Sequence, residues 1–478
     1  MNRPLIARVI GLILCIESVC MLPSLAIALL TQGADRPAFI YSVLLTGCIG
    51  LALAAIRPKS RRIQTRDGFV SVALCWIVLG LFGALPYAFY GYSYADAVFE
   101  TVSGFTTTGA TIVTAPSALP RGLQFWRALT QWMGGMGVLV MVLALLPSLG
   151  EGSVNLMKAE SPGPISSKLR PKTSETAKSL YIIYIVLTLA ETLILSLAGM
   201  PFFDSLTTSF TTISTGGFSV RDASIAYYGS EFINWVIVLF MFVSAINFGA
   251  LFQVQRREFK EAILSEELRI YSLITLGAVA LISIDLVLTL GQSIYASISE
   301  SAFQVVTLMT TTGYMTADFD LWPHFSKSVL LLVMFVGGCA GSTAGGVKVS
   351  RIIILFKGLK RELRRILHTR EVRPLTLEGA RVDEGTVSSV SVFFFSYIVI
   401  MMVCALVVSL DGVDLVTSLS AALTAISNVG PGLALVGPTC NFSFLSVLSK
   451  VVLTVTMLLG RLEIMPLLLL LFPSVWKK

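Results

Sequence analysis

The sequence predicts an all-α polytopic membrane protein in which four parallel helix–pore-loop–helix repeats surround a pseudo-fourfold pore, preceded by an N-terminal helix pair. Composition is the first observation: 55% of the 478 residues are hydrophobic, only 13% are charged, and the mean hydropathy is +0.82. These values lie outside the range of soluble globular proteins. The second observation is a set of four short Thr/Ser-rich stretches that end in glycine and interrupt otherwise apolar sequence.

Ten apolar runs are long enough to cross a bilayer, which takes about 20 residues in a helix. They lie at residues 6–31, 38–56, 68–91, 123–148, 179–199, 231–254, 269–292, 325–356, 387–410 and 444–474. Because the number of crossings is even, both ends of the chain are expected on the same side of the membrane.

Basic residues are concentrated in alternate connections between these runs. The clusters lie at residues 57–66, 158–178, 256–269 and 348–381. The positive-inside rule places such connections in the cytoplasm, and with them both termini. The net charge of +7 comes from this bias, so it favours phospholipid headgroups as partners and argues against nucleic acid.

The first 60 residues form a helix pair without a Thr/Ser-rich stretch, and four repeats follow. The repeats are expected at 68–150, 175–260, 265–370 and 385–478. Each repeat crosses the membrane twice in the same sense, so the four are parallel copies about an axis along the membrane normal. A parallel fourfold arrangement is typical of a channel.

The four stretches predict a re-entrant half-helix followed by an extended turn in each repeat. They are Thr106–Gly109, Ile213–Gly216, Thr310–Gly313 and Ser427–Gly430. Non-helical backbone lies at membrane depth only where protein or water covers it, so four copies would turn their carbonyl oxygens towards a common cation path. Loops that are Thr/Gly-rich by chance would explain one copy but not four.

The run 325–356 is too long for one straight crossing at about 1.5 Å per residue. Five glycines interrupt its middle: Gly337, Gly338, Gly341, Gly345 and Gly346. A broken helix is therefore expected in repeat three. The alternative is close helix packing through small residues, although the polar Ser342 and Thr343 suit a wet cavity better than a dry contact.

Arg461 lies near the middle of the last apolar run. A charge there costs at least about 2.5 kcal/mol unless it faces water or a partner. Arg461 is therefore expected either to face the pore or to pair with Glu463 or with a carboxylate of another repeat.

Taken together, these motifs make the whole chain similar to the TrkH/TrkG potassium-uptake subunits of the Trk/Ktr/HKT superfamily. Beyond the four stretches, the resemblance rests on Gln131–Gly137, on Gly337–Lys348 and on Gly460–Ile464. The additional N-terminal helix pair also fits TrkH-type subunits, whereas the shorter Ktr-type subunits lack it.

The resemblance implies potassium uptake across the bacterial cytoplasmic membrane through a selective ion-conducting pore. It also implies a homodimer in which each protomer has its own pore, gated by a cytoplasmic nucleotide-binding subunit of the TrkA type. Potassium would be the transported substrate, with no cofactor bound by this chain and no enzymatic activity. A sodium-permeable channel or a cation symporter on the same scaffold is the alternative.

Carried over by the resemblance, the selectivity filter comprises three residues of each repeat. These are Thr107, Thr108 and Gly109; Ser214, Thr215 and Gly216; Thr311, Thr312 and Gly313; and Asn428, Val429 and Gly430. Glycine at all four final positions favours potassium, because related plant HKT proteins with serine at the first prefer sodium. The resemblance assigns the gate to a loop under the filter and an arginine near it: Gly338, Gly341, Ser342, Thr343, Gly345, Gly346 and Arg461.

Overall fold

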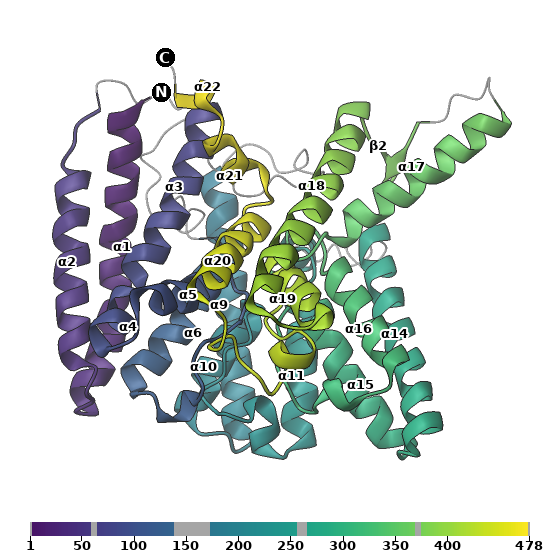
Figure 1. Ribbon diagram of the computed structural model, residues 1–478, viewed down its shortest axis with the longest axis horizontal. Helices are drawn as coiled ribbons and strands as arrows, with labels where there is room; N and C mark the ends of the chain where they lie inside the picture. The colour runs from purple at the N-terminus through teal and green to yellow at the C-terminus, as the bar shows by residue number, and fades with distance from the viewer. Residues whose placement is uncertain (1, 59–64, 138–172, 256–264, 369–373, 477–478) are drawn as a thin grey trace.

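The computed structural model describes residues 2–58, 65–137, 173–255, 265–368 and 374–476 and is almost entirely helical (Figure 1). In this part of the chain, the strands are β1 (Thr376–Leu377) and β2 (Ala380–Arg381), which pair antiparallel. The predicted ends of the first three repeats, at residues 150, 260 and 370, and most of the basic cluster at 158–178 lie outside the described residues.

The N-terminal pair consists of α1 (Arg3–Leu30) and α2 (Arg36–Ala54), which lie side by side at the left of Figure 1. Gly50 allows their close approach, because a Cβ there would lie 2.8 Å from the backbone nitrogen of Cys15. The pair packs on repeat one through contacts of α1 with α3 and α6 and of α2 with α4.

The first helix of each repeat is long and apolar. These helices are α3 (Thr65–Gly83) with its continuation α4 (Leu85–Tyr90), α9 (Thr173–Leu197), α14 (Glu266–Leu290) and α18 (Glu384–Val408), which the short turn η6 (Ser409–Asp411) extends. Together with α1 and α2 they account for the six helices, among the residues described, that are long and apolar enough to cross a membrane.

A buried half-helix follows the first helix in every repeat, and each is too short to span a bilayer. They are α5 (Tyr94–Phe105), α10 (Phe202–Ile213), α15 (Ile294–Met309) and α19 (Leu415–Ser427). Ser93, Ser293 and Asp414 cap three of them by accepting backbone N–H bonds. A short 3₁₀ turn lies in the connection after each: η1 (Pro116–Ala118), η4 (Ser224–Tyr228), η5 (Phe319–Leu321) and η7 (Ala434–Val436).

The second helix stops after 13 to 15 residues in every repeat. These helices are α6 (Arg121–Gly135), α11 (Glu231–Ser244), α16 (His324–Val336) and α20 (Val447–Arg461). The chain continues as α12 (Phe248–Gln255) in repeat two, as α17 (Val349–Leu367) in repeat three, and as α21 (Met465–Leu470) and α22 (Pro473–Trp476) in repeat four.

The broken helix expected in repeat three is thus present, and the runs 231–254 and 444–474, for which no break was expected, are broken as well. The α11–α12 pair bends by 101°. Between α20 and α21, Glu463 and Ile464 adopt φ of 55° and 69°, which an α-helix excludes, and Pro466 lies in the first turn of the next helix. Mean hydropathy did not reveal these breaks, since both runs remain apolar on average, although Arg461, Glu463 and Pro466 lie at the second break.

Packing between repeats closes a ring. The second helix of each repeat contacts the half-helix of the next, in the pairs α6 with α10, α11 with α15, α16 with α19, and α20 with α5. Each first helix contacts the half-helix of its own repeat. The same contact therefore recurs four times and returns to its start, which confirms the predicted pseudo-fourfold arrangement of parallel repeats.

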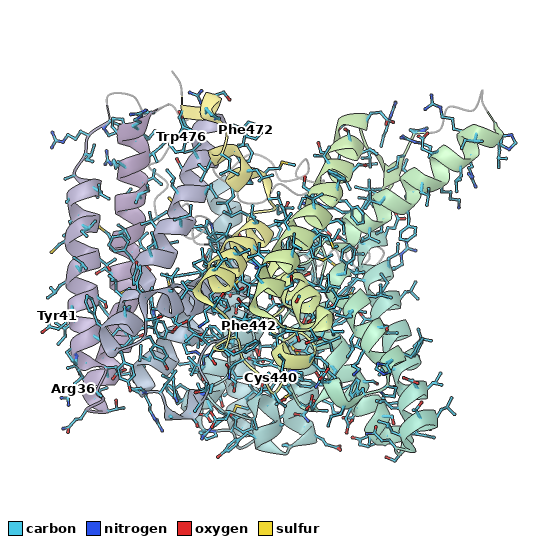
Figure 2. All side chains as sticks on the ribbon, viewed as in Figure 1. Arg36, Tyr41, Cys440, Phe442, Phe472 and Trp476 are labelled. Atoms are coloured by element: carbon cyan, nitrogen blue, oxygen red, sulfur yellow. The ribbon has the colours of Figure 1, made fainter. Side chains whose placement is uncertain are left out.

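Both chain ends lie at the same end of the bundle, and α17 projects from that end away from the other helices (Figure 1). Trp476 and Phe472 mark this end, whereas Arg36 and Cys440 lie towards the opposite one (Figure 2). Beyond its buried start, α17 exposes large apolar side chains together with its basic ones. The exposed apolar residues are Phe356, Leu359, Leu363, Ile366 and Leu367.

Candidate ion pathway

Each half-helix ends in a turn with the same unusual backbone. A left-handed residue lies one or two positions after the helix end in all four: Thr107, Thr215, Thr311 and Asn428, with φ of 55°, 55°, 59° and 56°. Two residues later comes a glycine with positive φ: Gly109, Gly217, Gly313 and Gly430, with φ of 81°, 75°, 85° and 98°. Left-handed threonine is rare because its branched Cβ meets the backbone, and such strain persists mainly at functional sites.

Repeat two differs from the expected set by one residue. Gly217, and not Gly216, is the equivalent of Gly109, while Ser214 is the C-cap residue of α10 as Thr106 is that of α5. The sequence has two glycines in succession, Gly216 and Gly217, and Gly216 was expected to be the final residue of the turn. The left-handed φ of Thr215 decides the register, because it aligns Thr215 with Thr107 and therefore Gly216 with Thr108.

The middle residues of the four turns form a ring with the glycines. A Cβ built on any of the four positive-φ glycines would lie within 3.0 Å of the middle carbonyl oxygen of another repeat. The pairs are Gly109 with Gly216 O, Gly217 with Thr312 O, Gly313 with Val429 O, and Gly430 with Thr108 O. Glycine is thus required at these four positions for two reasons: the backbone has a positive φ, and the adjacent carbonyl oxygen leaves no room for a Cβ.

Several polar side chains of the turns form hydrogen bonds with other protein groups. The hydroxyl groups of Thr108 and Thr312 form 2.8 Å hydrogen bonds with those of Thr106 and Thr310. Asn428 donates from Nδ2 to Thr108 Oγ1 at 2.9 Å and to Met457 O at 3.0 Å. These bonds engage the side chains with protein partners, so the backbone carbonyls are the groups best suited to meet an ion.

The glycine-rich loop between α16 and α17 is hydrogen-bonded to three repeats. Gly345 N–H donates to Thr311 Oγ1 at 2.7 Å, and Gly346 N–H donates to Ser427 O at 2.9 Å. The Thr343 hydroxyl donates to the last carbonyl of α10 at 3.2 Å and to that of α11 at 3.1 Å. The loop thus runs across the C-terminal ends of these half-helices, directly beside the four turns.

The other expected loop residues serve mainly to hold its shape. The Ser342 hydroxyl donates to Cys339 O at 2.6 Å, and Gly341 O accepts from Phe248 N–H at 3.0 Å. Gly338 lies against Ala344 and Ala245, where a Cβ would find no room. Close packing through small residues and a loop beneath the turns are therefore both present in this structure.

Glu267, at the start of α14, anchors both ends of the loop, and sequence reasoning missed it. Its Oε1 accepts from Ala340 N–H at 2.7 Å and from Ser350 N–H at 3.1 Å, and the residue is only 4% exposed. Its position beside basic residues at the start of an apolar run gives no signal of this role, because the partners are more than 70 residues away.

Arg461 joins the loop to repeat one. Its guanidinium donates to Thr107 Oγ1 at 3.2 Å, to Thr343 O at 2.8 Å, and to the carbonyls of Gly134 and Gly135 at 2.6 and 2.7 Å. Glu463, the partner considered from sequence, instead forms an ion pair with Arg351 at the start of α17. Pairing with Glu463 therefore does not account for Arg461, which lies beneath the first turn.

On the other side of the turns, acidic side chains form ion pairs with basic ones. Glu100 and Arg127 form a buried ion pair at 2.8 Å, and Asp96 pairs with Lys450 at 2.6 Å. Arg127 also donates to Ser219 O at 2.9 Å, so the pair links repeat one with repeat two. These pairs tie the half-helices to neighbouring helices and leave the turns held from both sides.

Comparison with known proteins identifies the family. Residues 36–478 match the family model of TrkH, described as a cation transport protein. The chain is 39% identical to the Trk system potassium uptake protein TrkH of Halomonas elongata, with each chain covered completely. It is 34% identical to TrkG of Escherichia coli K12, with 99% of this chain and 98% of TrkG covered.

A solved structure agrees with the sequence relatives. The crystal structure of the potassium transporter TrkH from Vibrio parahaemolyticus superposes with a TM-score of 0.89 at 36% identity, and the match covers all of both chains. The relatives are transport proteins and not enzymes, in line with the expectation from sequence. This chain, with its four repeats and its ring of turns, belongs to the TrkH family of cation transport proteins.

Proposed function

We propose that this chain takes up potassium across the bacterial cytoplasmic membrane, with both termini in the cytoplasm, through a pore lined by the four turns. The observation that carries the proposal is the closed ring of middle carbonyls, each set against a glycine of another repeat. Such oxygens can replace the hydration shell of a cation and still release it. Relatives named as potassium uptake proteins support potassium as the ion.

The proposed filter is the expected set with the register of repeat two moved by one residue. It comprises Thr107, Thr108 and Gly109; Thr215, Gly216 and Gly217; Thr311, Thr312 and Gly313; and Asn428, Val429 and Gly430. Four glycines still occupy the final positions, so the argument for potassium over sodium is unchanged.

The proposed gate is the loop from Gly337 to Lys348 together with Arg461. In the described conformation the loop forms hydrogen bonds with repeats two, three and four, and Arg461 connects it to repeat one. The loop and Arg461 are therefore tied to all four repeats on the inner side of the turns. Opening requires these bonds to break together. A partner that pulls on α17, which begins directly after the loop and projects from the bundle, would do this.

The partner we propose is a cytoplasmic nucleotide-binding subunit of the TrkA type, acting on a homodimer of this chain. Relatives named as parts of a Trk system support a multi-component assembly. The purified chain in liposomes is expected to show low potassium flux alone and higher flux when a TrkA-type subunit and nucleotide are added. Equal flux with and without the subunit would contradict gating by this partner.

Replacing Gly109 with serine tests the filter directly. The new Cβ would meet the carbonyl of Gly216 and would be strained at φ of 81°, so the ring should distort and the potassium-to-sodium flux ratio should fall about tenfold or more. The measurement is competition between the two ions in liposomes containing purified protein, expressed per folded molecule.

Gly91→Ser is the matched control for that experiment. Gly91 also has a positive φ, of 126°, but nothing lies within 4 Å of its Cβ position, so the substitution introduces strain without a clash. Its flux ratio should equal that of the wild type. A well-folded Gly109→Ser protein with unchanged selectivity would rule out the assignment, and a wild-type preference for sodium would favour the sodium-permeable alternative.

A further inference from the structure

Repeat two has the least intrinsic support in the ring of turns. Its middle and final residues, Gly216 and Gly217, are both glycine, and glycine has more backbone freedom than any other residue. The middle residues Thr108 and Thr312 carry hydroxyl groups that bond to their own repeats, and Val429 has a buried apolar side chain. Gly216 has no side chain, so within its own repeat its turn is held only by backbone bonds such as that from Gly216 N–H to Thr211 O at 2.8 Å.

Gln131 of α6 supplies this support across the boundary between repeats one and two. Its Nε2 donates to Gly216 O at 2.6 Å, and its Oε1 accepts from Phe218 N–H at 3.0 Å. The two bonds straddle Gly217, and the side chain is completely buried. A primary amide offers both a donor and an acceptor in one plane, which is the combination that these two backbone groups require.

The fit also explains why residue 216 is glycine. A Cβ there would lie 2.6 Å from Gln131 Oε1 and 2.7 Å from Nε2. Gly216 is not among the residues with positive φ, so its own backbone would accept alanine. The space taken by the Gln131 amide, and not the local conformation, therefore excludes a side chain at this position.

We infer that Gln131 is a specificity-determining positioning residue, whose amide clamps the repeat-two carbonyl at the distance that favours potassium. The inference rests on the proposed function, since it assumes that the ring is the filter. Gln131 acts through Gly216 and does not itself meet the ion. It lies one turn before Gly134 and Gly135, whose carbonyls bind Arg461, so one helix end supports both the filter and the proposed gate.

Gln131→Met is the first test, because methionine has similar length and volume but no donor or acceptor of comparable strength. The potassium-to-sodium flux ratio should fall about tenfold, the scale set by losing one to two buried hydrogen bonds at the filter. Gln124→Met is the matched control, since Gln124 lies on the same helix and donates to Pro116 O at 2.9 Å, away from the turns. Its ratio should stay at the wild-type value.

The second test approaches the same contact from the other side. Gly216→Ala should displace the amide and lower the flux ratio as Gln131→Met does. The double variant Gln131→Ala/Gly216→Ala relieves the clash without restoring the bonds, so it should regain folded yield but remain unselective. If the double variant instead regains wild-type selectivity, residue 131 matters only for its volume and the inference fails.

The outcomes separate the inference from the function on which it rests. A wild-type protein without potassium preference would overturn the proposed function and this inference with it. A potassium-selective wild type whose Gln131→Met variant folds and stays equally selective would overturn the inference alone. Stabilisation of the melting temperature by potassium over sodium gives a second readout that needs no transport: it should be present in the wild type and in Gln124→Met, and lost in Gln131→Met.

Discussion

Replacing Gly345 with alanine is expected to raise potassium flux through the purified chain, without any partner, by about tenfold or more. A Cβ on Gly345 would overlap the carbonyl of Ser427 and would lie 3.1 Å from the Asn428 side chain, so the loop could not keep its place beside the turns. The displaced loop would also lose the bonds from Gly345 to Thr311 and from Gly346 to Ser427. Each bond contributes about 1 kcal/mol, and the free energy for tenfold opening is about 1.4 kcal/mol.

Gly358→Ala provides the control for this experiment. Gly358 lies on α17, and nothing is found within 4 Å of its Cβ position, so alanine there should leave flux unchanged. The measurement is ion uptake into liposomes, normalised to the amount of folded protein. Wild-type flux in a folded Gly345→Ala protein would show that the loop does not obstruct the pathway and would leave it a packing role only.

Arg461→Ala is expected to produce the second large effect, a leak of cations in the absence of the partner. The substitution removes four hydrogen bonds that join the first turn, the loop and the end of α6. It also removes a fixed positive charge below the filter, which opposes cation entry most strongly where little water is present. Both losses act in the same direction, so the leak should be larger than that of any single loop variant.

Arg461→Lys separates the two contributions. Lysine keeps the charge but loses the planar fork that reaches four acceptors at once, so it should retain the electrostatic barrier and lose part of the loop anchorage. An intermediate leak is therefore expected. Arg36→Ala is the control, because Arg36 likewise donates to backbone carbonyls, those of Gln32 and Gly33, but begins α2 of the N-terminal pair, outside the four repeats. Equal flux in Arg461→Ala and wild-type protein would contradict the barrier.

The ion pair of Glu463 distinguishes a leak caused by Arg461→Ala from a loss of folded protein. Since Glu463 pairs with Arg351, removal of Arg461 does not leave it without its ion-pair partner. Removal of Arg351 does, and because the Glu463 side chain is only 18% exposed, the cost approaches the roughly 3 to 5 kcal/mol of a buried charge without its partner. Arg351→Ala should therefore lower the yield of folded protein more than Arg461→Ala does.

The class of the protein and its repeat plan were decided by the sequence alone. A membrane-spanning segment can be recognised from the length of an apolar run alone, because any run of this composition is driven out of water. The repeats can be recognised because the four Thr/Ser-rich stretches recur at similar intervals. The turns at Thr107, Thr311 and Asn428 were placed correctly, since a glycine two residues later marks where the half-helix must end. The glycines of 337–346 likewise predicted a break in repeat three.

Only the tertiary structure decided the register of repeat two, the breaks after Ser244 and Arg461, and the partners of Arg461, Glu267 and Gln131. The physical reason is common to all of these features. Mean hydropathy measures how apolar a segment is and not the direction of its backbone, so a helix can break inside a run that remains apolar on average. The hydrogen bonds that position the turns join residues tens to hundreds of positions apart, and those partners meet only when the four repeats close into a ring.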